Sequence, residues 1–177
     1  DAQRAYEEAK MRAEQATRNA DSSQKLMGIG LSCWIEIASF GPNGSLEGFG
    51  HLASWESAQV RMQPDGSAII SAGTSPHGQG NATVFAQIAA DELGIDFDDI
   101  YIRFGATETV QQGIGTMGSR AVALCGDAVK GASIKVRDKA IEIAAHRLEA
   151  NPADLSVADG KFSVLGTPSR FITWADV

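Results

Sequence analysis

Two glycine-rich loops, each running into a helix-like stretch, constrain this chain more than any other feature. The first reads His77-Gly78-Gln79-Gly80-Asn81, and the second extends from Gly113 to Arg120 with the sequence GIGTMGSR. A helix N-terminus leaves about four backbone N–H groups without intrahelical partners and carries partial positive charge. Glycines just before it let the backbone approach a ligand closely, so those N–H groups can meet a phosphate. Two such loops predict paired cradles for one large, anionic, polar cofactor.

The polar side chains of the loops suit such a ligand, although each loop alone has a simpler interpretation. The amide of Gln79 can donate and accept hydrogen bonds, which suits a heterocycle with mixed edges. Thr116 and Ser119 supply hydroxyls, and Arg120 can pair with a phosphate. In the simpler interpretation, Asn81 only caps one helix, and the other helix is capped by serine and carries a surface arginine. Neither loop matches the GxxxxGK[ST] phosphate-binding loop or the GxGxxG dinucleotide fingerprint.

The order of strand-like and helix-like segments predicts an α/β (α+β) fold, in which a mixed sheet is layered with helices. A hairpin is expected from Ala58 to Ala72, because Pro64-Asp65-Gly66 turns the chain between two β-rich arms. A helix follows the first loop and ends at Gly94, and Ile100–Phe104 has the pattern of a short strand. Strand, helix and strand in this order indicate at least one parallel crossover.

Further elements are expected on either side of this unit. Residues 2–18 have the pattern of an exposed connecting helix, and alternation from Ile29 to Ile37 predicts a strand. A long helix of small residues is expected from Ser119 to Glu149, with an interruption near Gly131. A closing hairpin is expected between Leu155 and Val164.

Composition and charge narrow the class of protein. The chain has 177 residues, 44% of them hydrophobic, and a net charge of −7, so a nucleic-acid partner is not expected. No apolar run approaches the roughly 20 residues of a membrane span. Cys33 and Cys125 lie far apart without a CxxC pattern, so we expect buried free thiols in a reducing, cytoplasmic compartment. His51, His77 and His146 are too scattered to predict a metal site.

One stretch of sequence resembles a known family. The run from Gly73 to Ile95, GTSPHGQGNATVFAQIAADELGI, resembles the molybdopterin-binding subunit of the xanthine dehydrogenase/aldehyde oxidase/carbon monoxide dehydrogenase family. The segment Gly113–Arg120 resembles that family's second cofactor loop, typically GxGTxGSR. Lys25–Glu36 and Asn151–Asp154 are also similar. The resemblance implies a molybdopterin-binding domain over residues 25–177, as a fragment of a longer subunit, preceded by a connecting helix over residues 1–24.

The resemblance also implies a cofactor and the residues that hold it. The cofactor is a pyranopterin dithiolene carrying molybdenum, in bacteria often the cytosine dinucleotide form, and its own sulfurs hold the metal. No protein metal ligand is therefore expected. The implied cofactor-binding residues lie on both loops: His77, Gly78, Gln79, Gly80 and Asn81 on the first, and Thr116, Met117, Gly118, Ser119 and Arg120 on the second.

Enzymes of this family transfer water-derived oxygen to a substrate carbon as a hydride leaves for the metal. Electrons then pass to iron–sulfur clusters and a flavin (FAD) on other domains or subunits. The resemblance therefore implies that the assembled protein is an oxidoreductase that oxidises an aldehyde, an N-heterocycle or carbon monoxide. Its implied partners are the rest of the large subunit, the iron–sulfur and flavin subunits, and a small-molecule substrate.

The sequence departs from the family pattern in two places. The family usually has His-Glu-Thr after GQG, where this chain has Asn81-Ala82-Thr83, and Met117 stands at a position that is often aromatic. The family's catalytic base is a glutamate in a glycine-rich segment further downstream, so no catalytic residue is assigned here and the isolated chain is expected to be inactive. The change at Asn81-Ala82 also leaves open a non-catalytic scaffold that keeps the fold for assembly with partner subunits.

Overall fold

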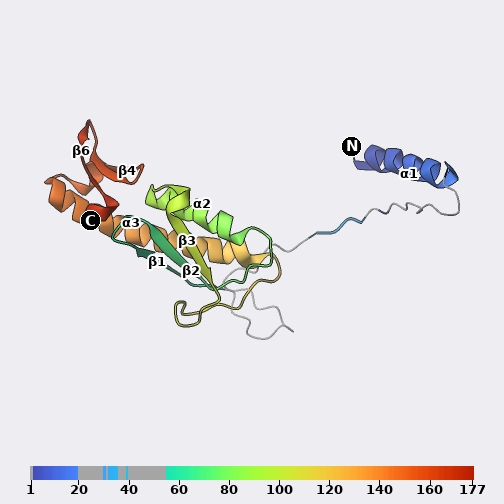
Figure 1. Ribbon diagram of the computed structural model, residues 1–177, viewed down its shortest axis with the longest axis horizontal. Coiled ribbons are helices and arrows are strands. Elements are labelled where there is room, and N and C mark those ends of the chain that lie inside the picture. Colours follow the sequence, from blue (N-terminus) through green and yellow to red (C-terminus); the bar gives the residue numbers. More distant parts are fainter. Residues whose placement is uncertain (1, 20–29, 31, 36–38, 40–54) are drawn as a thin grey trace. The chain divides into compact units, whose positions relative to one another are not determined.

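The computed structural model describes residues 2–19, 30, 32–35, 39 and 55–177 (Figure 1). The chain divides into two compact units, Asp1–Ile35 and Glu36–Val177. The domain boundary expected between residues 24 and 25 lies outside the described residues.

The first unit contains helix α1 (Ala2–Asn19), which confirms the helix expected over residues 2–18. Its side chains are mostly exposed, and Arg4 pairs with Glu8 one turn away at 3.0 Å. The strand expected from Ile29 to Ile37 is wrong over its described part, since residues 30 and 32–35 belong to no helix or strand. Alternation makes a strand only where a neighbour supplies hydrogen bonds, and none of the described strand pairs includes this segment. Cys33 is accordingly exposed, not buried as expected.

The second unit is built on a three-stranded mixed sheet. Strands β1 (Ala58–Met62) and β2 (Ala68–Ala72) form the expected antiparallel hairpin, and β3 (Ile100–Phe104) pairs with β2 in parallel. Helix α2 (Asn81–Leu93) connects β2 to β3, which confirms the parallel crossover. The chain turns between β1 and β2 at Gly66, which has a left-handed φ of 90°. Glycine adopts this conformation at little cost because it has no Cβ.

Two helices cover one face of this sheet. Helix α3 (Asp127–Leu148) packs along α2 and over β1, while α2 packs against β3 (Figure 1). The strands β1 and β3 alternate between inward and exposed side chains, as expected for a sheet with one covered face. The core between the layers includes fully buried Ile70, Phe85, Leu93 and Val129.

The long helix is interrupted at a different place from the one expected. A π-helical turn, η2 (Ala121–Gly126), leads directly into α3, and Gly131 lies inside α3. A single glycine costs a helix about 1 kcal/mol, which is small beside the packing of a helix along a core. The expected interruption near Gly131 is therefore wrong.

A second, antiparallel sheet completes the unit. The expected closing hairpin is confirmed as β4 (Leu155–Ala158) and β5 (Lys161–Val164), and β6 (Thr167–Thr173) adds a third strand that the sequence did not predict. Short 3₁₀ turns, η1 (Phe97–Asp99), η3 (Pro152–Asp154) and η4 (Trp174–Asp176), lie beside the strands. Together the two sheets and their helices confirm the α/β (α+β) class.

Trp174 fastens the second sheet to the C-terminal end of α2. Its indole Nε1 donates a hydrogen bond to the Leu93 carbonyl oxygen at 3.0 Å, and its ring meets Phe162 edge-on with centroids 4.8 Å apart. The Gly160 amide donates to the Gly94 carbonyl oxygen at 2.7 Å. The far end of α2 is therefore fixed, and its N-terminal end leads back to the first glycine loop.

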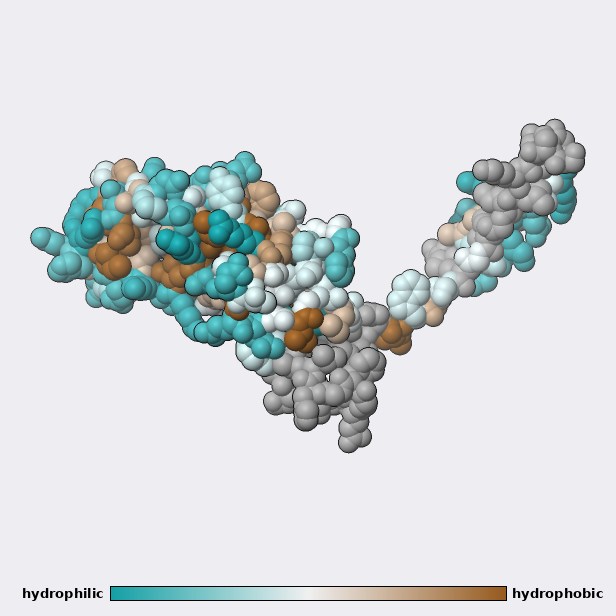
Figure 2. Space-filling view, turned by 60° about the horizontal axis from the view of Figure 1, so that its bottom comes forward, coloured by the Kyte–Doolittle hydropathy of each residue, from teal (hydrophilic) through white to brown (hydrophobic). Residues whose placement is uncertain are grey.

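The surface of the described residues is mixed in character. On the face shown in Figure 2, hydrophilic and hydrophobic residues form small interspersed patches. Among the helices that the structure describes, none combines the length and the apolar character that a membrane crossing requires.

Candidate cofactor site

The first glycine loop connects β2 to α2 and is open to the outside. Gly78 and Gly80 have left-handed φ angles of 93° and 82°, and a Cβ built on either residue would meet nothing within 4 Å. The loop from His77 to Gly80 is exposed. Gln79 folds back on this loop, because its Oε1 accepts a hydrogen bond from the His77 amide at 2.5 Å. That contact leaves the Gln79 Nε2 available as a donor to a ligand.

The N-terminus of α2 has no side-chain cap. Gly80 is the capping residue, so the expectation that Asn81 caps the helix is wrong. An N-cap residue normally has an extended backbone. Here the residue before the helix is the left-handed Gly80, and Asn81 is already the first helical residue. No acidic side chain lies in the first turn. The free N–H groups and the helix dipole are therefore available to an anion.

Asn81 instead is the first residue of α2 and is buried. The residue is 2% exposed, and its Nδ2 has no hydrogen-bond partner among the described residues. Buried amide groups are normally paired, because leaving one unpaired costs about 1–3 kcal/mol. An unpaired donor at the uncapped end of a helix is a feature that a polar ligand would satisfy.

The second glycine loop lies between β3 and η2. It contains three consecutive exposed residues, Met117, Gly118 and Ser119, and Gly118 and Ser119 have left-handed φ angles of 53° and 54°. Gly115 is also left-handed, and a Cβ there would meet nothing within 4 Å. The loop therefore presents its tip outward, as the first loop does.

The structure brings these two loops into direct contact. The Thr116 hydroxyl donates to the Ser75 carbonyl oxygen at 2.5 Å and accepts from the Ser75 amide at 3.2 Å. The backbones cross at Gly73 and Gly113, where a Cβ on Gly113 would lie 2.5 Å from the Cα of Gly73. Only glycine fits at such a crossing. The two loops thus lie together in the structure, as the sequence predicted. That their side chains contact a cofactor stays a prediction.

Arg120 does not lie on the surface, so the interpretation of a serine-capped helix with a surface arginine is wrong. Its side chain is 3% exposed, and Nη1 donates to the fully buried carboxylate of Glu56. Nη1 also donates to the Gly115 carbonyl oxygen at 3.0 Å, and Nη2 to the Trp55 carbonyl oxygen at 3.2 Å. The guanidinium is thus engaged by the protein. Glu56 carried no sequence signal, because a single acidic residue before a strand is unremarkable on its own.

A buried thiol lies beneath the loops. Cys125, in η2, is fully buried, as the sequence suggested. Burial raises the pKa of this thiol above its ordinary value. The thiol is therefore neutral near pH 7, because its pKa lies above the ordinary value of 9.0.

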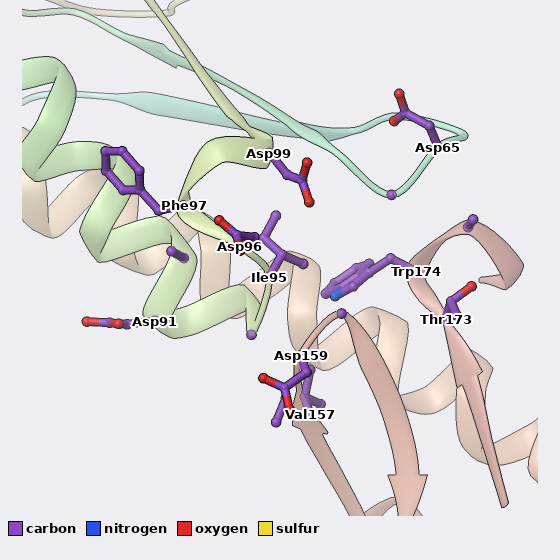
Figure 3. Close-up of a pocket in the computed structure, with 16 residues that line it drawn as sticks. Asp65, Asp91, Ile95, Asp96, Phe97, Asp99, Val157, Asp159, Thr173 and Trp174 are labelled. Atoms are coloured by element: carbon purple, nitrogen blue, oxygen red, sulfur yellow. The ribbon is translucent and has the colours of Figure 1, made fainter.

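A cleft of the second unit lies at the opposite end of α2 from the loops. It encloses about 950 Å³, and Trp174 and Ile95 form part of its wall (Figure 3). Its lining includes five carboxyl side chains, those of Asp65, Asp91, Asp96, Asp99 and Asp159. Such a lining repels phosphate, so this cleft does not suit an anionic cofactor. Across the described ranges, no three His, Cys, Asp or Glu side chains are grouped to hold a metal ion.

Comparison with known proteins shows the family to which the chain belongs. A family model described as "Molybdopterin cofactor-binding domain" matches residues 1–177. The chain belongs to that family. It is 44% identical over 167 residues to the carbon monoxide dehydrogenase large chain of Hydrogenophaga pseudoflava, covering 94% of this chain and 21% of the relative.

Two further matches support the family. The nicotine 6-hydroxylase large subunit of Paenarthrobacter nicotinovorans is 35% identical over 159 residues, covering 89% of this chain and 19% of that subunit. The solved structure of reconstituted CO dehydrogenase from Oligotropha carboxidovorans matches with a TM-score of 0.64 and 44% identity, over 69% of this chain and 15% of that one. This molybdopterin cofactor-binding domain therefore spans about a fifth of the length of the curated relatives it matches.

The described residues fit an anionic pterin cofactor on three observations. The N-terminus of α2 is uncapped and free of acidic side chains, Asn81 Nδ2 is buried without a partner, and Gly78, Gly80 and Gly115 face open space. A backbone that approaches a ligand closely needs such glycines, and a phosphate needs such N–H groups.

Proposed function

We propose that this chain forms the part of a molybdenum hydroxylase large subunit that cradles the molybdenum cofactor between its two glycine loops. The observation that carries the proposal is the direct contact of the loops through Thr116 and Ser75, beside the uncapped N-terminus of α2. The family match to residues 1–177 supports a molybdopterin ligand. The proposed form of that ligand is the cytosine dinucleotide.

Each part of the cradle has a separate role in this proposal. The first-turn N–H groups of α2 bind the diphosphate, because they combine unpaired donors with the positive end of the helix dipole. Gln79 Nε2 and Asn81 Nδ2 donate to oxygen or nitrogen atoms of the pterin region. Gly118 and Ser119 present backbone and hydroxyl groups from the second loop. Arg120, being buried, supports that loop from behind.

When bound, the cofactor supplies molybdenum chemistry that accepts a hydride equivalent from the substrate. The chain's own residues orient the cofactor and do not abstract a proton. Glu56 is an acidic group at the loops, but its buried carboxylate is paired with Arg120 and is unsuited to act on a substrate. The catalytic base, the substrate pocket, and the iron–sulfur and FAD partners would be supplied by the rest of a cytoplasmic complex. The proposed substrates are an aldehyde, an N-heterocycle or carbon monoxide.

A second candidate function, a non-catalytic scaffold of the same fold, predicts no cofactor. The buried, unpaired Asn81 Nδ2 favours the cradle, because a scaffold gains nothing from that costly donor.

The proposal is tested by the cofactor content of the complete subunit, purified from a host that makes the cofactor. We expect Gln79→Ala and Asn81→Leu each to weaken retention about tenfold, the effect of one lost hydrogen bond to a charged or strongly polar group. Molybdenum is measured by mass spectrometry and pterin by fluorescence after oxidation. Gln87→Ala is the matched control, because Gln87 is exposed further along the same helix. Unchanged molybdenum and pterin content in both loop variants would count against the cradle. An unsubstituted subunit that carries neither molybdenum nor pterin would favour the scaffold.

A further inference from the structure

Glu56 and Arg120 form a buried ion pair behind the second loop. The Glu56 side chain is fully buried and that of Arg120 is 3% exposed, whereas the Glu92–Arg137 pair on the same unit is 20% and 28% exposed. Charges are removed from water only at a cost, which a buried pair recovers when its geometry and additional hydrogen bonds are good. The contribution of the Glu56–Arg120 pair therefore depends on the additional hydrogen bonds that its two side chains make.

The pair holds the backbone of the second loop at two neighbouring residues. Glu56 Oε1 accepts from the Ile114 amide at 3.3 Å, and Arg120 Nη1 donates to the Gly115 carbonyl oxygen at 3.0 Å. The next residue, Ser57, extends this attachment, because its hydroxyl donates to the Gln112 carbonyl oxygen at 2.7 Å and accepts from the Gln112 amide at 2.9 Å. Segment 112–115 is thus tied to the residues just before β1.

The same carboxylate also faces the first loop. A Cβ on Gly73 would lie 2.5 Å from Glu56 Oε2 and 2.7 Å from the Gln112 carbonyl oxygen. The first loop can therefore pass the second only because Gly73 has no side chain. Glu56 Oε2 is buried and has no hydrogen-bond partner among the described residues. The Glu56 carboxylate sits where the two loops cross.

We propose that Glu56 is a positioning residue that sets the second cofactor loop against the first, and that Arg120, paired with Glu56, braces the same loop from inside. Glu56 holds the Ile114 amide and Arg120 holds the Gly115 carbonyl oxygen, and the ion pair joins these two contacts. Neither side chain touches the cofactor. The consequence for cofactor retention rests on the proposed function, whereas the restraint on the loop does not.

The test is a double-mutant cycle in the complete subunit with hydrogen exchange of segment 112–120 as the readout. Glu56→Gln keeps the shape and removes the charge, Arg120→Gln removes the partner, and the double variant removes both. We expect each single variant to speed exchange in this segment about tenfold, and the double variant to add little more, because coupled residues are not additive. Glu56→Asp, which keeps the charge, should restore part of the protection.

The matched control is Glu92→Gln, which removes a carboxylate from a partly exposed ion pair on α2. It should leave exchange in segment 112–120 unchanged. Unchanged exchange in Glu56→Gln would overturn the proposal. If the variants do not fold, the unsubstituted subunit still decides: the Ile114 amide should exchange slowly, and exchange as fast as in an unstructured peptide would equally overturn it.

Cofactor release separates this proposal from the proposed function. If Arg120 contacts a phosphate directly, Arg120→Gln will release pterin much faster than Glu56→Gln and the two losses will add, which contradicts the brace. If the loop loosens in both variants while pterin content stays at the unsubstituted level, the positioning role holds and the cradle fails.

Discussion

At the scale of single residues, the hydrogen-bond partners of a buried polar group decide whether it supports the fold or remains available to a ligand. Arg120 is the residue of the second loop best suited to a phosphate by its chemistry, yet it points inward to Glu56. Asn81 is suited to a helix cap by its chemistry, yet it is buried with an unpaired Nδ2. The two residues differ because the Arg120 guanidinium has hydrogen-bond partners inside the protein, whereas the Asn81 Nδ2 has none among the described residues.

The two cysteines differ in burial, and their reactivity should differ accordingly. Cys33 is exposed and Cys125 is fully buried, so we expect iodoacetamide at pH 8 to label Cys33 first and Cys125 roughly a hundredfold more slowly, after transient opening. Mass spectrometry of the labelled peptides measures both rates. The Cys33→Ser variant should lose the fast phase, and a fast phase that persists in it would contradict the burial of Cys125.

The raised pKa of Cys125 also gives the stability a pH dependence. Its ordinary value is 9.0, and burial raises the folded-state pKa above it. As pH rises above 9.0 the unfolded chain loses the thiol proton before the folded chain does, so stability is full below pH 9.0 and declines above it. Urea unfolding at pH 8 and pH 10 should show this decline, and Cys125→Ala should reduce it.

At the scale of elements, the structure assigns different roles to glycines that look alike in the sequence. Gly94 ends α2 with a left-handed φ of 63°, and a Cβ there would lie 3.0 Å from the Val157 carbonyl oxygen. Gly131 lies inside α3, where a Cβ would meet nothing within 4 Å. Gly94 is required both by its left-handed backbone and by its close neighbour, whereas neither reason applies to Gly131.

Alanine substitutions should therefore have opposite effects on the free energy of unfolding. We expect Gly131→Ala to stabilise the chain by about 0.5–1 kcal/mol and Gly94→Ala to destabilise it by at least about 1–2 kcal/mol. Gly160→Ala is the control for backbone strain alone, because Gly160 is left-handed at 71° but has open space around it. Urea unfolding measures all three, and a Gly131→Ala variant less stable than the parent would contradict the geometry.

Sequence reasoning succeeded for elements with local signals. The Pro64-Asp65-Gly66 turn, the helix end at Gly94 and the β4–β5 hairpin each depend on neighbouring residues, and the structure confirms them. It failed where partners lie far apart. Glu56 and Arg120 are 64 positions apart, and β6 becomes a strand only through its pairing with β5. The segment 29–37 shows the converse, since alternation there has no described partner strand.

At the scale of the whole second unit, the two ends of α2 have different roles. Its C-terminal end is fastened to the second sheet through Trp174 and Leu93. Its N-terminal end continues from the first glycine loop, which contacts the second through Ser75 and Thr116. Over 13 residues these ends are about 20 Å apart. The Asp-lined cleft at the fastened end and the uncapped helix end at the loops thus differ in charge character. An anionic ligand is directed to the loops.

The most direct test of this account is a structure of the complete subunit with its cofactor bound. We predict that the phosphate oxygens lie within hydrogen-bond distance, roughly 3 Å, of the first-turn amide nitrogens of α2, between the two loops. Gln79 and Asn81 should then donate to the same ligand. A cofactor bound in the Asp-lined cleft, or away from both loops, would contradict the account.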